Sequence, residues 1–315
     1  MANTSRIAHF DIDEIFSSCF KEKKYPFSLE LKNINKIDKT ASLAIISIKS
    51  NSKISKEILK KLPKLKAIIT RTVGVNHIDL KLCQEKGIAV YHVPDYGAFA
   101  IAEHVFAMLL SQTRKIIPLG KETKAGRFNW KNGQGFTLKG KTLGVIGVGK
   151  TGKEVIKIAK GFQMKIIGFD KIKDNTFARQ NNFKYVPLNE LLSKADIISI
   201  NIPLIKETRH LINKDKIKIM KNNAILINVS RGEIINTKDL ADNLAKFKYI
   251  CLDVLEGENL YNLKEATIKK LAASDKVLIT PHIAFFTDLT TKEIAKITYQ
   301  NIKNFLKGSK ENRVI

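Results

Sequence analysis

A glycine-rich turn between two short apolar stretches most constrains how this chain can fold. The first stretch, residues 143–148, runs into Gly147, Gly149 and Gly152, which are spaced as G-x-G-x-x-G. A helical pattern of apolar residues follows directly, and a second apolar stretch then ends in Asp170. This order of strand, glycine turn, helix, strand and acid is typical of a dinucleotide-binding site in a parallel α/β sheet.

The glycines and the acid each have a physical role in such a site. Glycine lets the backbone turn tightly and approach a pyrophosphate, whose charge is stabilised at the helix N-terminus. Asp170, 23 residues after Gly147, is placed to accept hydrogen bonds from a ribose 2′-hydroxyl and to repel a 2′-phosphate. Lys171 and Lys173 weaken this preference only slightly, so we expect NAD and not NADP. An ordinary glycine-rich βα turn is the alternative interpretation.

The composition argues against nucleic acid as the primary partner. The 315-residue chain has a formal net charge of +25, with 55 Lys and Arg residues. Only eight of these are Arg, so 55 − 8 leaves 47 Lys, spread over nearly every predicted helix without a basic stripe. Because 44% of the residues are hydrophobic, the chain can bury a large core, and its length favours two domains.

The cysteines and the apolar stretches predict a cytoplasmic protein. The sequence contains three cysteines, Cys19, Cys83 and Cys251. They lack C-x-x-C spacing, which favours buried free thiols in a reducing compartment. Residues 1–10 have no signal-peptide core. The longest apolar stretch, residues 98–110, is interrupted by Glu103 and His104 and is too short to cross a bilayer, so we expect no membrane partner.

The residues before the glycine turn predict a first α/β unit. Strand-like stretches alternate with helical patterns over about the first hundred residues, which indicates a parallel sheet. Asp11 and Asp13 form a D-x-D pair after the first strand, and we interpret them as a strand end and a helix N-cap, with no metal site.

A loop in this first unit is a candidate for ligand binding. Ligands of open parallel sheets bind beyond the carboxyl ends of the strands, and the N–H groups of Gly74 and Val75 follow such an end. They are placed to hold a carboxylate. His77 lies in the same loop, but a lone loop histidine is more often structural than catalytic.

A long helix predicted over residues 98–117 joins the two units. It is followed by an irregular arm, residues 126–140, that contains the only tryptophan, Trp130. Aromatic residues flanked by glycines here are consistent either with packing inside the chain or with a contact between subunits. The sequence leaves both possibilities open.

Three stretches that follow predicted strands carry reactive side chains: residues 228–232, 253–258 and 280–286. They supply an Arg, a Glu and a His at the edge where the reactive ring of a bound dinucleotide lies. Hydride delivery to a ketone leaves an alkoxide, so an imidazolium can donate the proton. A neighbouring carboxylate raises the pKa of that histidine, and a guanidinium can bind a substrate carboxylate and polarise the adjacent carbonyl.

With these motifs the sequence resembles the D-2-hydroxyacid dehydrogenases, from about residue 42 to residue 304. The resemblance implies two doubly wound parallel-sheet domains of α/β class. A Rossmann NAD domain, residues 101–283, is inserted in a flavodoxin-like substrate domain made of residues 1–100 and 284–315. The helix at residues 289–306 completes the substrate domain.

The resemblance also implies roles for individual residues. Arg231 is the substrate clamp, His282 is the acid/base, and Glu258, not Glu256, is the partner of the histidine. The implied cofactor contacts are Gly147, Gly149, Lys150, Thr151, Gly152, Asp170, Pro203, Thr208, Val229, Ser230, Asp253 and Ala284. The implied substrate contacts are Val73, Gly74, Val75, Tyr96 and Phe285.

Within the family, residues 253–258 and 282–286 look most like the D-lactate dehydrogenase branch, which implies pyruvate and D-lactate as the substrate pair and a homodimer. Glyoxylate, hydroxypyruvate or a branched 2-oxo acid are alternative substrates. Formate dehydrogenases pair the histidine with Gln, so Glu258 argues against them. An NAD-sensing protein similar to a transcriptional corepressor is the alternative from another class.

One segment departs from the family pattern. Residues 244–252 contain no glycine and are about two residues shorter than usual. This puts in question how the preceding helix is capped and how closely the next strand packs.

Overall fold

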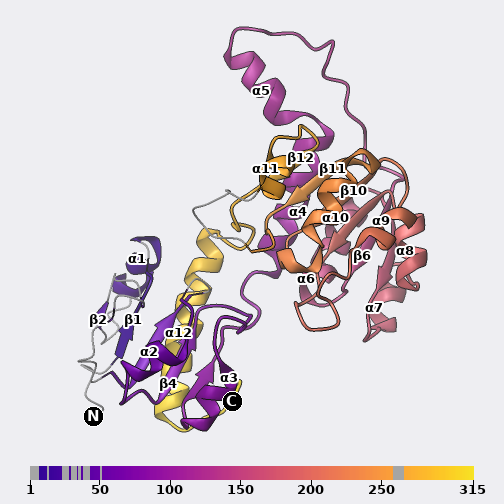
Figure 1. Ribbon diagram of the computed structural model, residues 1–315. Coiled ribbons are helices and arrows are strands. Elements are labelled where there is room, and N and C mark those ends of the chain that lie inside the picture. Colours follow the sequence, from indigo (N-terminus) through magenta and orange to yellow (C-terminus); the bar gives the residue numbers. More distant parts are fainter. Residues whose placement is uncertain are drawn as a thin grey trace. The chain divides into compact units, whose positions relative to one another are not determined.

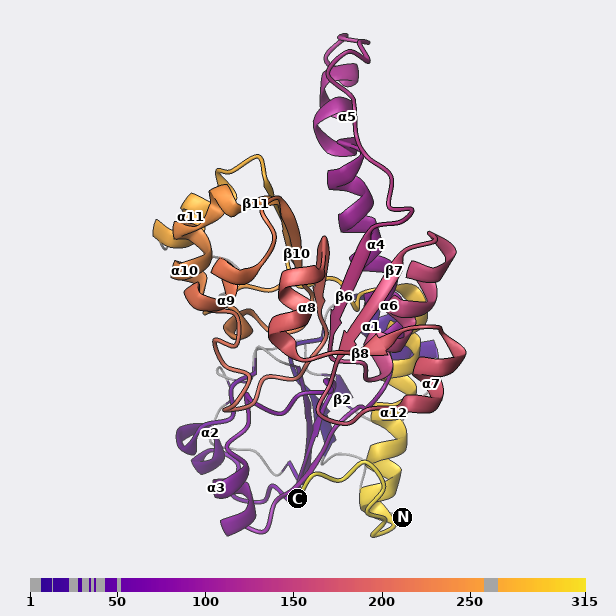
Figure 2. The same ribbon diagram turned by 90° about the vertical axis from the view of Figure 1, so that its right-hand side faces the viewer.

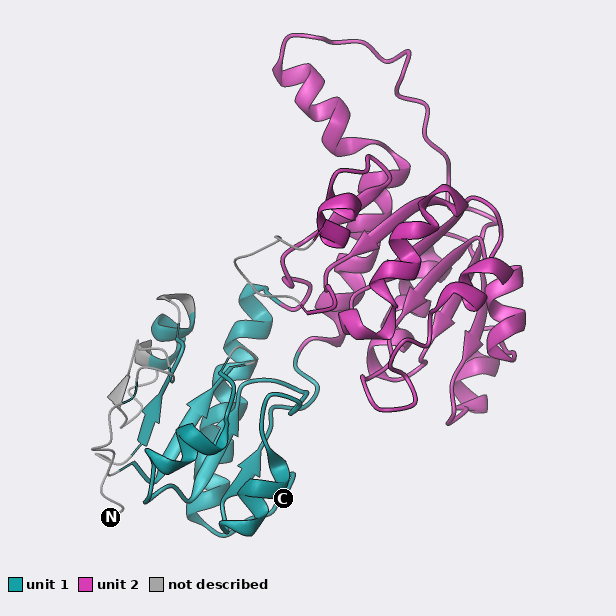
Figure 3. Cartoon of the chain, in the orientation of Figure 1, with its two compact units in different colours: residues 1–96, 286–315 teal, residues 97–285 magenta. Residues whose placement is uncertain are grey.

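A computed structural model of the chain describes residues 7–12, 14–22, 28–29, 34, 37, 43–49, 52–257 and 266–315. The chain divides into two compact units (Figure 3). Unit 1 comprises residues 1–96 and 286–315, and unit 2 comprises residues 97–285. The domain boundaries predicted from the sequence are 100/101 and 283/284.

Unit 2 is built on a parallel sheet of seven strands (Figure 1). The strands are β6 (Thr142–Ile146), β7 (Lys165–Phe169), β8 (Lys184–Tyr185), β9 (Ile197–Ile200), β10 (Ala224–Asn228), β11 (Phe247–Leu252) and β12 (Val277–Ile279). Their order is β12-β11-β10-β9-β6-β7-β8. Counted within the unit this is 3-2-1-4-5-6 with one further strand, the Rossmann order. The predicted Rossmann domain is therefore confirmed.

Helices cover both faces of this sheet. One face packs on α4 (Ala98–Thr113) and α6 (Lys150–Gly161), and α7 (Asn175–Gln180) joins the same core. The other face packs on α8 (Leu188–Lys194), α9 (Lys214–Ile219), α10 (Thr237–Asp242) and α11 (Ala266–Ala272). Because both faces are buried, the strands are apolar throughout, as in Ile197–Ile200.

Unit 1 is a smaller parallel sheet of five strands. The strands are β1 (Ile7–His9), β2 (Ser28–Leu29), β3 (Ile45–Ile48), β4 (Ala67–Thr70) and β5 (Ala89–Tyr91), in the order β2-β1-β3-β4-β5. This is the flavodoxin-like order, as predicted. The helices are α1 (Glu14–Glu22), α2 (Lys56–Lys60), α3 (Leu80–Glu85) and α12 (Asp288–Leu306). Helices α2 and α3 pack on one face of the sheet, and α12 packs on the other.

The last part of the chain completes unit 1. Helix α12 begins with a capping box in which Thr287 and Thr290 each bind the other's backbone N–H. The Asn301 side-chain amide donates to the carbonyl of His92 at 2.7 Å. Beyond the helix, the N–H of Val314 donates to the carbonyl of Val90 at 2.7 Å, so the tail covers the edge strand β5.

The predicted helix over residues 98–117 is wrong at its end. Helix α4 stops at Thr113, and Lys115 adopts a left-handed backbone (φ 54°) before α5 (Ile116–Lys124) begins. Pro118 explains the break, because proline is tolerated in the first turn of a new helix but not inside a continuing one. In unit 2, α5 and the arm project away from the sheet (Figure 2).

Two of the arm's three aromatic residues are not buried within the chain. Phe128 is 94% exposed and Trp130 is 85% exposed. Of the two interpretations left open by the sequence, packing inside the chain holds for Phe136, which packs against the core of unit 2, but not for Phe128 or Trp130. The base of the arm is fixed at Gly135, where a Cβ would lie 2.2 Å from the carbonyl oxygen of Thr113.

The glycine-free segment, residues 244–252, is accommodated without a left-handed residue. Helix α10 ends at Asp242, and a single 3₁₀ turn, Leu244–Lys246, leads directly into β11. The Asn243 side-chain amide donates to the carbonyl of Asp239 at 2.8 Å and so caps the helix in place of a glycine. The β10–β11 pairing shifts register between Ala224 and Ile225 and passes over Lys248 of β11.

The structure also bears on the predictions for the cysteines, for Asp13 and for membrane spans. Cys83 and Cys251 are buried free thiols as predicted, whereas Cys19 is partly exposed, because it lies on α1 outside the core. Asp13, the predicted helix N-cap, lies outside the described residues. Across the described ranges, no helix combines the length and apolar character that a membrane span requires.

Candidate active site

The three glycines after β6 have three different reasons to be glycine. Gly147 has a φ of +90°, and a Cβ on it would lie 2.6 Å from the carbonyl oxygen of Asn201. A Cβ on Gly152, in the first turn of α6, would lie 2.0 Å from the carbonyl oxygen of Gly147. At Gly149 no heavy atom lies within 4 Å of the Cβ position. The first and third glycines are thus required by the protein, and the second leaves an open approach to the helix N-terminus.

Asp170 follows β7 and is tied to the glycine turn. One carboxylate oxygen accepts the N–H of Val148 at 2.6 Å, and the other accepts the N–H of Ile172 at 3.0 Å. These bonds fix the direction of the carboxylate beside the turn. Lys150 and Thr151 occupy the first turn of α6, where Lys150 is exposed.

The segment after β9 is shaped by one buried hydroxyl. Thr208 donates to the carbonyl of Pro203 at 2.7 Å and accepts the N–H of Ile205 at 2.8 Å. Pro203 itself is exposed. Thr208 therefore sets the course of this loop from inside, and Pro203 presents its surface outward.

Arg231 lies on a tightly specified loop after β10. The buried side chain of Asn228 accepts the N–H of Ser230 at 3.1 Å and donates to the carbonyl of Arg231 at 2.9 Å. The Ser230 hydroxyl donates to the carbonyl of Ile200 at 2.9 Å. A Cβ on Gly232 would lie 1.9 Å from the carbonyl carbon of Leu255, so only glycine fits there. Arg231 is half-buried, and its guanidinium donates to the carbonyl of Ser230 at 2.7 Å.

Asp253, directly after β11, is a buried carboxylate with several donors. Its side chain accepts the hydroxyl of Thr280 at 2.6 Å and the N–H groups of Ile283 and Ala284 at 2.9 Å each. Burial raises the pKa of Asp253, but the hydrogen bonds from His104, Thr280, Ala284 and Ile283 outweigh it and hold the pKa below its usual value. Asp253 is therefore an anion that organises the loop after β12.

His282 is held in an unusual backbone conformation by that loop. Its φ is +55°, a left-handed region that costs about 1–2 kcal/mol for a residue with a Cβ. The N–H of His282 donates to the carbonyl of Asp253 at 2.8 Å. The His282 ring lies edge-on to the ring of Phe285, with centroids 6.3 Å apart. The half-buried imidazole is thus positioned by fixed neighbours.

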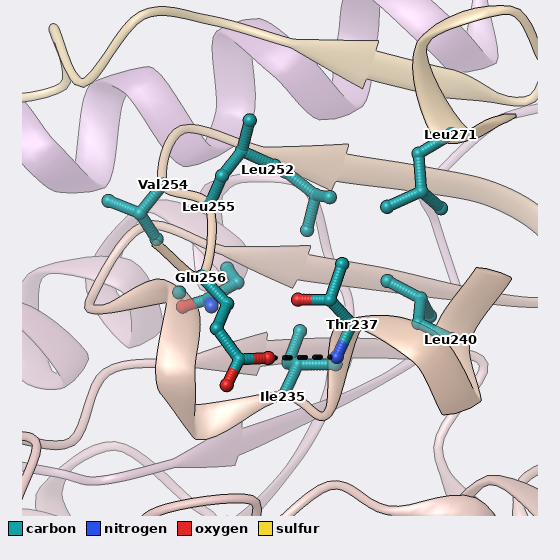
Figure 4. A pocket seen from close by; sticks show the side chains of 10 residues that line it. Ile235, Thr237, Leu240, Leu252, Val254, Leu255, Glu256 and Leu271 are labelled. Carbon is teal, nitrogen blue, oxygen red and sulfur yellow. Dashed lines mark hydrogen bonds between the residues drawn. The ribbon is translucent and has the colours of Figure 1, made fainter. Parts of the chain in front are cut away.

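The two glutamates after β11 differ in what the structure says of them. Glu256 accepts His210 Nε2 at 2.6 Å and the N–H of Thr237 at 3.2 Å. It lies beside a small pocket under α10 and α11 (Figure 4). The pocket has room for about one water molecule and is too small for a substrate. Glu256 is thus engaged with His210, consistent with its exclusion as the partner of His282. Glu258 lies outside the described residues.

Three of the candidate substrate residues of unit 1, Val73, Gly74 and Val75, lie on one supported loop after β4. Thr72 donates its hydroxyl to the carbonyl of Gly74 at 2.6 Å, and the carbonyl of Val73 lies 2.9 Å from His92 Nδ1. His77 Nε2 lies 3.0 Å from the hydroxyl of Thr70. His77 therefore has a structural contact, as the sequence favoured. Tyr96 is the last residue of unit 1 before the chain enters unit 2.

Comparison with known proteins decides the family. Residues 106–284 match the family model described as "D-isomer specific 2-hydroxyacid dehydrogenase, NAD binding domain". The chain belongs to the D-isomer specific 2-hydroxyacid dehydrogenases. The predicted resemblance to this NAD-dependent family is confirmed.

Members of this family with different activities are similar to the chain at comparable sequence identity. A D-3-phosphoglycerate dehydrogenase from Methanocaldococcus jannaschii is 34% identical over 89% of this chain, but the chain spans only 53% of that protein. A glyoxylate reductase from Pyrococcus horikoshii is 33% identical, with 91% of this chain and 85% of that protein covered. The D-lactate dehydrogenase of Aquifex aeolicus, solved with NAD and lactic acid, is 33% identical with a TM-score of 0.87, covering 97% of each chain.

The residues of this 2-hydroxyacid dehydrogenase fit the family's cofactor, NAD. The open position at Gly149 and the N-terminus of α6 suit a pyrophosphate, and Asp170 beside the turn suits a ribose diol. When bound, the nicotinamide ring supplies or accepts the hydride.

Sequence reasoning missed several residues that shape the site, listed here: His104, His210, Asn228 and Thr280. The partners of His104, His210 and Thr280 are distant in sequence, so no local motif reveals these three. Asn228 binds Ser230 and Arg231 within its own loop. His104 gave one signal, because it interrupts an otherwise apolar helical stretch. Its Nε2 lies 3.0 Å from the Thr280 hydroxyl and 3.5 Å from the Asp253 carboxylate.

Proposed function

We propose that the protein reduces a small 2-oxo acid with NADH to the D-2-hydroxy acid, with pyruvate and D-lactate as the substrate pair. The observation that carries this proposal is the pair of loops after β10 and β12. They present a guanidinium, Arg231, and an imidazole, His282, at the carboxyl edge of the sheet that carries the glycine turn.

In the proposed reaction, Arg231 binds the substrate carboxylate and polarises the neighbouring carbonyl. NADH, held at the glycine turn, would provide the hydride that the carbonyl carbon accepts. The His282 imidazolium donates its proton to the carbonyl oxygen, so the products are the hydroxy acid, NAD⁺ and a neutral imidazole. A proton from solvent restores the imidazolium. Glu258 is proposed to keep this histidine protonated.

The substrate choice follows the relatives. The solved D-lactate dehydrogenase with lactic acid supports pyruvate, and the glyoxylate reductase at equal identity supports glyoxylate as the second candidate. One pocket residue shifts such a preference by only about 1–3 kcal/mol. NADH oxidation should therefore be measured with pyruvate, longer and branched 2-oxo acids, glyoxylate and hydroxypyruvate. Tight NADH binding with negligible turnover on every acid would instead indicate an NAD-sensing binding protein.

Arg231→Lys tests the role of the arginine. Lysine keeps the charge but loses the planar fork that can contact a carboxylate and a carbonyl together. Losing one partner of such a contact costs about 3–5 kcal/mol, so kcat/KM for the 2-oxo acid should fall by about two orders of magnitude or more. The affinity for NADH, followed by its fluorescence, should stay nearly the same. Weaker NADH binding with an unchanged KM for the acid would show that Arg231 only closes the cofactor groove.

We also propose that the arm binds a second copy of the chain and that the enzyme is a cytoplasmic homodimer. The exposed Phe128 and Trp130 support this, because large apolar side chains gathered on a projecting arm are typical of subunit contacts. Phe128→Ser combined with Trp130→Ser should convert a dimer to a monomer in analytical ultracentrifugation. A wild-type monomer at micromolar concentration would contradict the proposal.

A further inference from the structure

His104 and Thr280 are half-buried and form a chain of hydrogen bonds that ends on the buried Asp253. His104 is on α4, Thr280 follows β12, and Asp253 follows β11, so three separate elements meet at this point. His104 Nε2 lies 3.0 Å from the Thr280 hydroxyl oxygen, and that oxygen lies 2.6 Å from Asp253 Oδ1. The side chain of His104 is 18% exposed, and that of Asp253 is fully buried.

The direction of the protons follows from the chemistry of the three groups. Asp253 is an anion, so it only accepts hydrogen bonds. Thr280 has one hydroxyl proton, and the short contact commits it to Asp253. The Thr280 oxygen can then only accept from the histidine, so His104 Nε2 carries a proton. The order of donation is His104 to Thr280 to Asp253, and His104 Nε2 also lies 3.5 Å from Asp253 Oδ1, close enough to contribute directly to the lowered pKa of that carboxyl.

Asp253 transmits this arrangement to the loop of His282. Its carbonyl accepts the N–H of His282 at 2.8 Å, and its carboxylate accepts the N–H groups of Ile283 and Ala284. Three consecutive backbone N–H groups are therefore held by one residue. These contacts keep His282 in its left-handed conformation and fix the backbone position from which its imidazole extends.

We propose that His104 and Thr280 are positioning residues for the proton transfer: they orient the Asp253 carboxylate, which in turn fixes the backbone and hence the ring of His282. This inference rests on the proposed role of His282 as the acid/base. Neither residue needs to touch the substrate. A shift of the imidazole by a fraction of an ångström is enough to weaken proton donation.

Two matched pairs of variants test the proposal in the full-length enzyme. Thr280→Val keeps the shape but removes the hydroxyl, and Thr280→Ser keeps the hydroxyl. His104→Leu removes the donor, and His104→Gln keeps an N–H group near the position of Nε2. We expect kcat for the 2-oxo acid to fall about tenfold or more in the Val and Leu variants, because a hydrogen bond to a buried charge is lost. The Ser and Gln variants should retain at least a third of the wild-type kcat.

The isotope effect on hydride transfer separates positioning from a loss of stability. With NADH deuterated at the transferred position, the effect on kcat should rise in Thr280→Val, because misaligned proton donation makes the chemical step limiting. Measurements are made well below each variant's Tm, with NADH binding followed by fluorescence. If Thr280→Val does not fold, the His104 pair gives the same comparison. Equal kcat and equal isotope effects within each pair would overturn the proposal.

Failure of the proposed function itself looks different. In that case wild-type protein turns over none of the 2-oxo acids, or His282→Gln keeps the wild-type rate. If wild type is active and His282→Gln is not, the comparison within the two pairs decides the role of His104 and Thr280 alone.

Discussion

Two loops at the carboxyl edge of the seven-stranded sheet are shaped by different physics. The turn after β6 requires residues without a side chain, because a Cβ on Gly147 or Gly152 would collide with backbone oxygens. The loop after β12 is held by one buried carboxylate, that of Asp253, which accepts hydrogen bonds from Thr280, Ile283 and Ala284. In the first loop, a Cβ on Gly152 would clash with a neighbour in sequence, Gly147, and a Cβ on Gly147 would clash with Asn201 after β9. The second depends on residues from α4, β11 and β12.

This difference explains which loop a sequence reveals. Steric requirements for glycine recur at fixed short spacing, so they form a motif. A buried polar network is assembled from positions far apart in the chain, and its members look ordinary one at a time. The glycine turn should therefore fail through crowding, and the His282 loop through loss of hydrogen bonds.

Gly152→Ala should have the largest effect on the first loop. The added methyl would lie 2.0 Å from the carbonyl oxygen of Gly147, so the turn must open and NADH binding should fall by about 100-fold or more. Gly149→Ala is the matched control, since its methyl meets no atom within 4 Å. It should preserve the Tm and still weaken NADH binding, because the methyl occupies the approach of the pyrophosphate. Normal NADH titrations for Gly152→Ala would break the comparison.

Asp170→Ala should have an intermediate effect, confined to the choice of cofactor. Removing the carboxylate loses hydrogen bonds to the ribose and the repulsion of a 2′-phosphate, so the preference for NADH over NADPH should narrow by about tenfold. Asp174→Ala is the control: Asp174 caps α7 and pairs with Lys153 at 2.7 Å. That variant should change stability and leave the cofactor ratio unchanged. Equal kcat/KM for NADH and NADPH in wild type would refute the assignment.

Variants of Glu256 and Glu258, which follow β11 in the sequence, should give the smallest and most selective effects. Glu258→Gln should lower the apparent pKa of the group that must be protonated for 2-oxo acid reduction by about one unit, so activity is lost at lower pH than in wild type. Glu256→Gln should leave this pH profile unchanged. If the two variants exchange these behaviours, the assignment of Glu258 is wrong.

Glu256→Gln should instead change stability with pH. Burial raises the pKa of Glu256, but hydrogen bonds from His210 and Thr237 outweigh it and lower the pKa overall. The stabilisation is therefore present above the unfolded-state pKa and is lost as pH falls through the lowered pKa. The variant should be about 1–2 kcal/mol less stable near pH 7, and urea unfolding should show this difference shrinking in acid.

Much of the fold could be predicted because each element carries its own signal. Buried parallel strands are short apolar runs, such as Ala67–Thr70, and the helices between them show an apolar face. The break between α4 and α5 was missed, although Pro118 marks it, because the apolar pattern continues through Ile116 and Ile117. The strands β2 and β8, of two residues each, are too short to give a pattern.

The candidate site could be predicted only in part. Arg231, Asp253 and His282 were found because each follows a strand end, where parallel sheets bind ligands. Some of the contacts that hold them, such as His104 with Thr280, depend on tertiary structure. The pairing of Glu256 with His210 joins positions 46 residues apart in the chain. No spacing rule links such residues, so only coordinates reveal them.

The way the last residues return to unit 1 has a consequence for biosynthesis. Ile302 of α12 packs against Ile69 and Tyr91 in the unit 1 core, and Val314 pairs with Val90. On the ribosome, Ile302 and Val314 emerge only after all of residues 97–285 have been translated. Nascent unit 1 must therefore wait with one apolar sheet face uncovered, in a state that is open to aggregation. Unit 1 begins translation first but completes its core last. Its sheet face stays exposed, and open to chaperone binding, for as long as translation of the inserted unit takes.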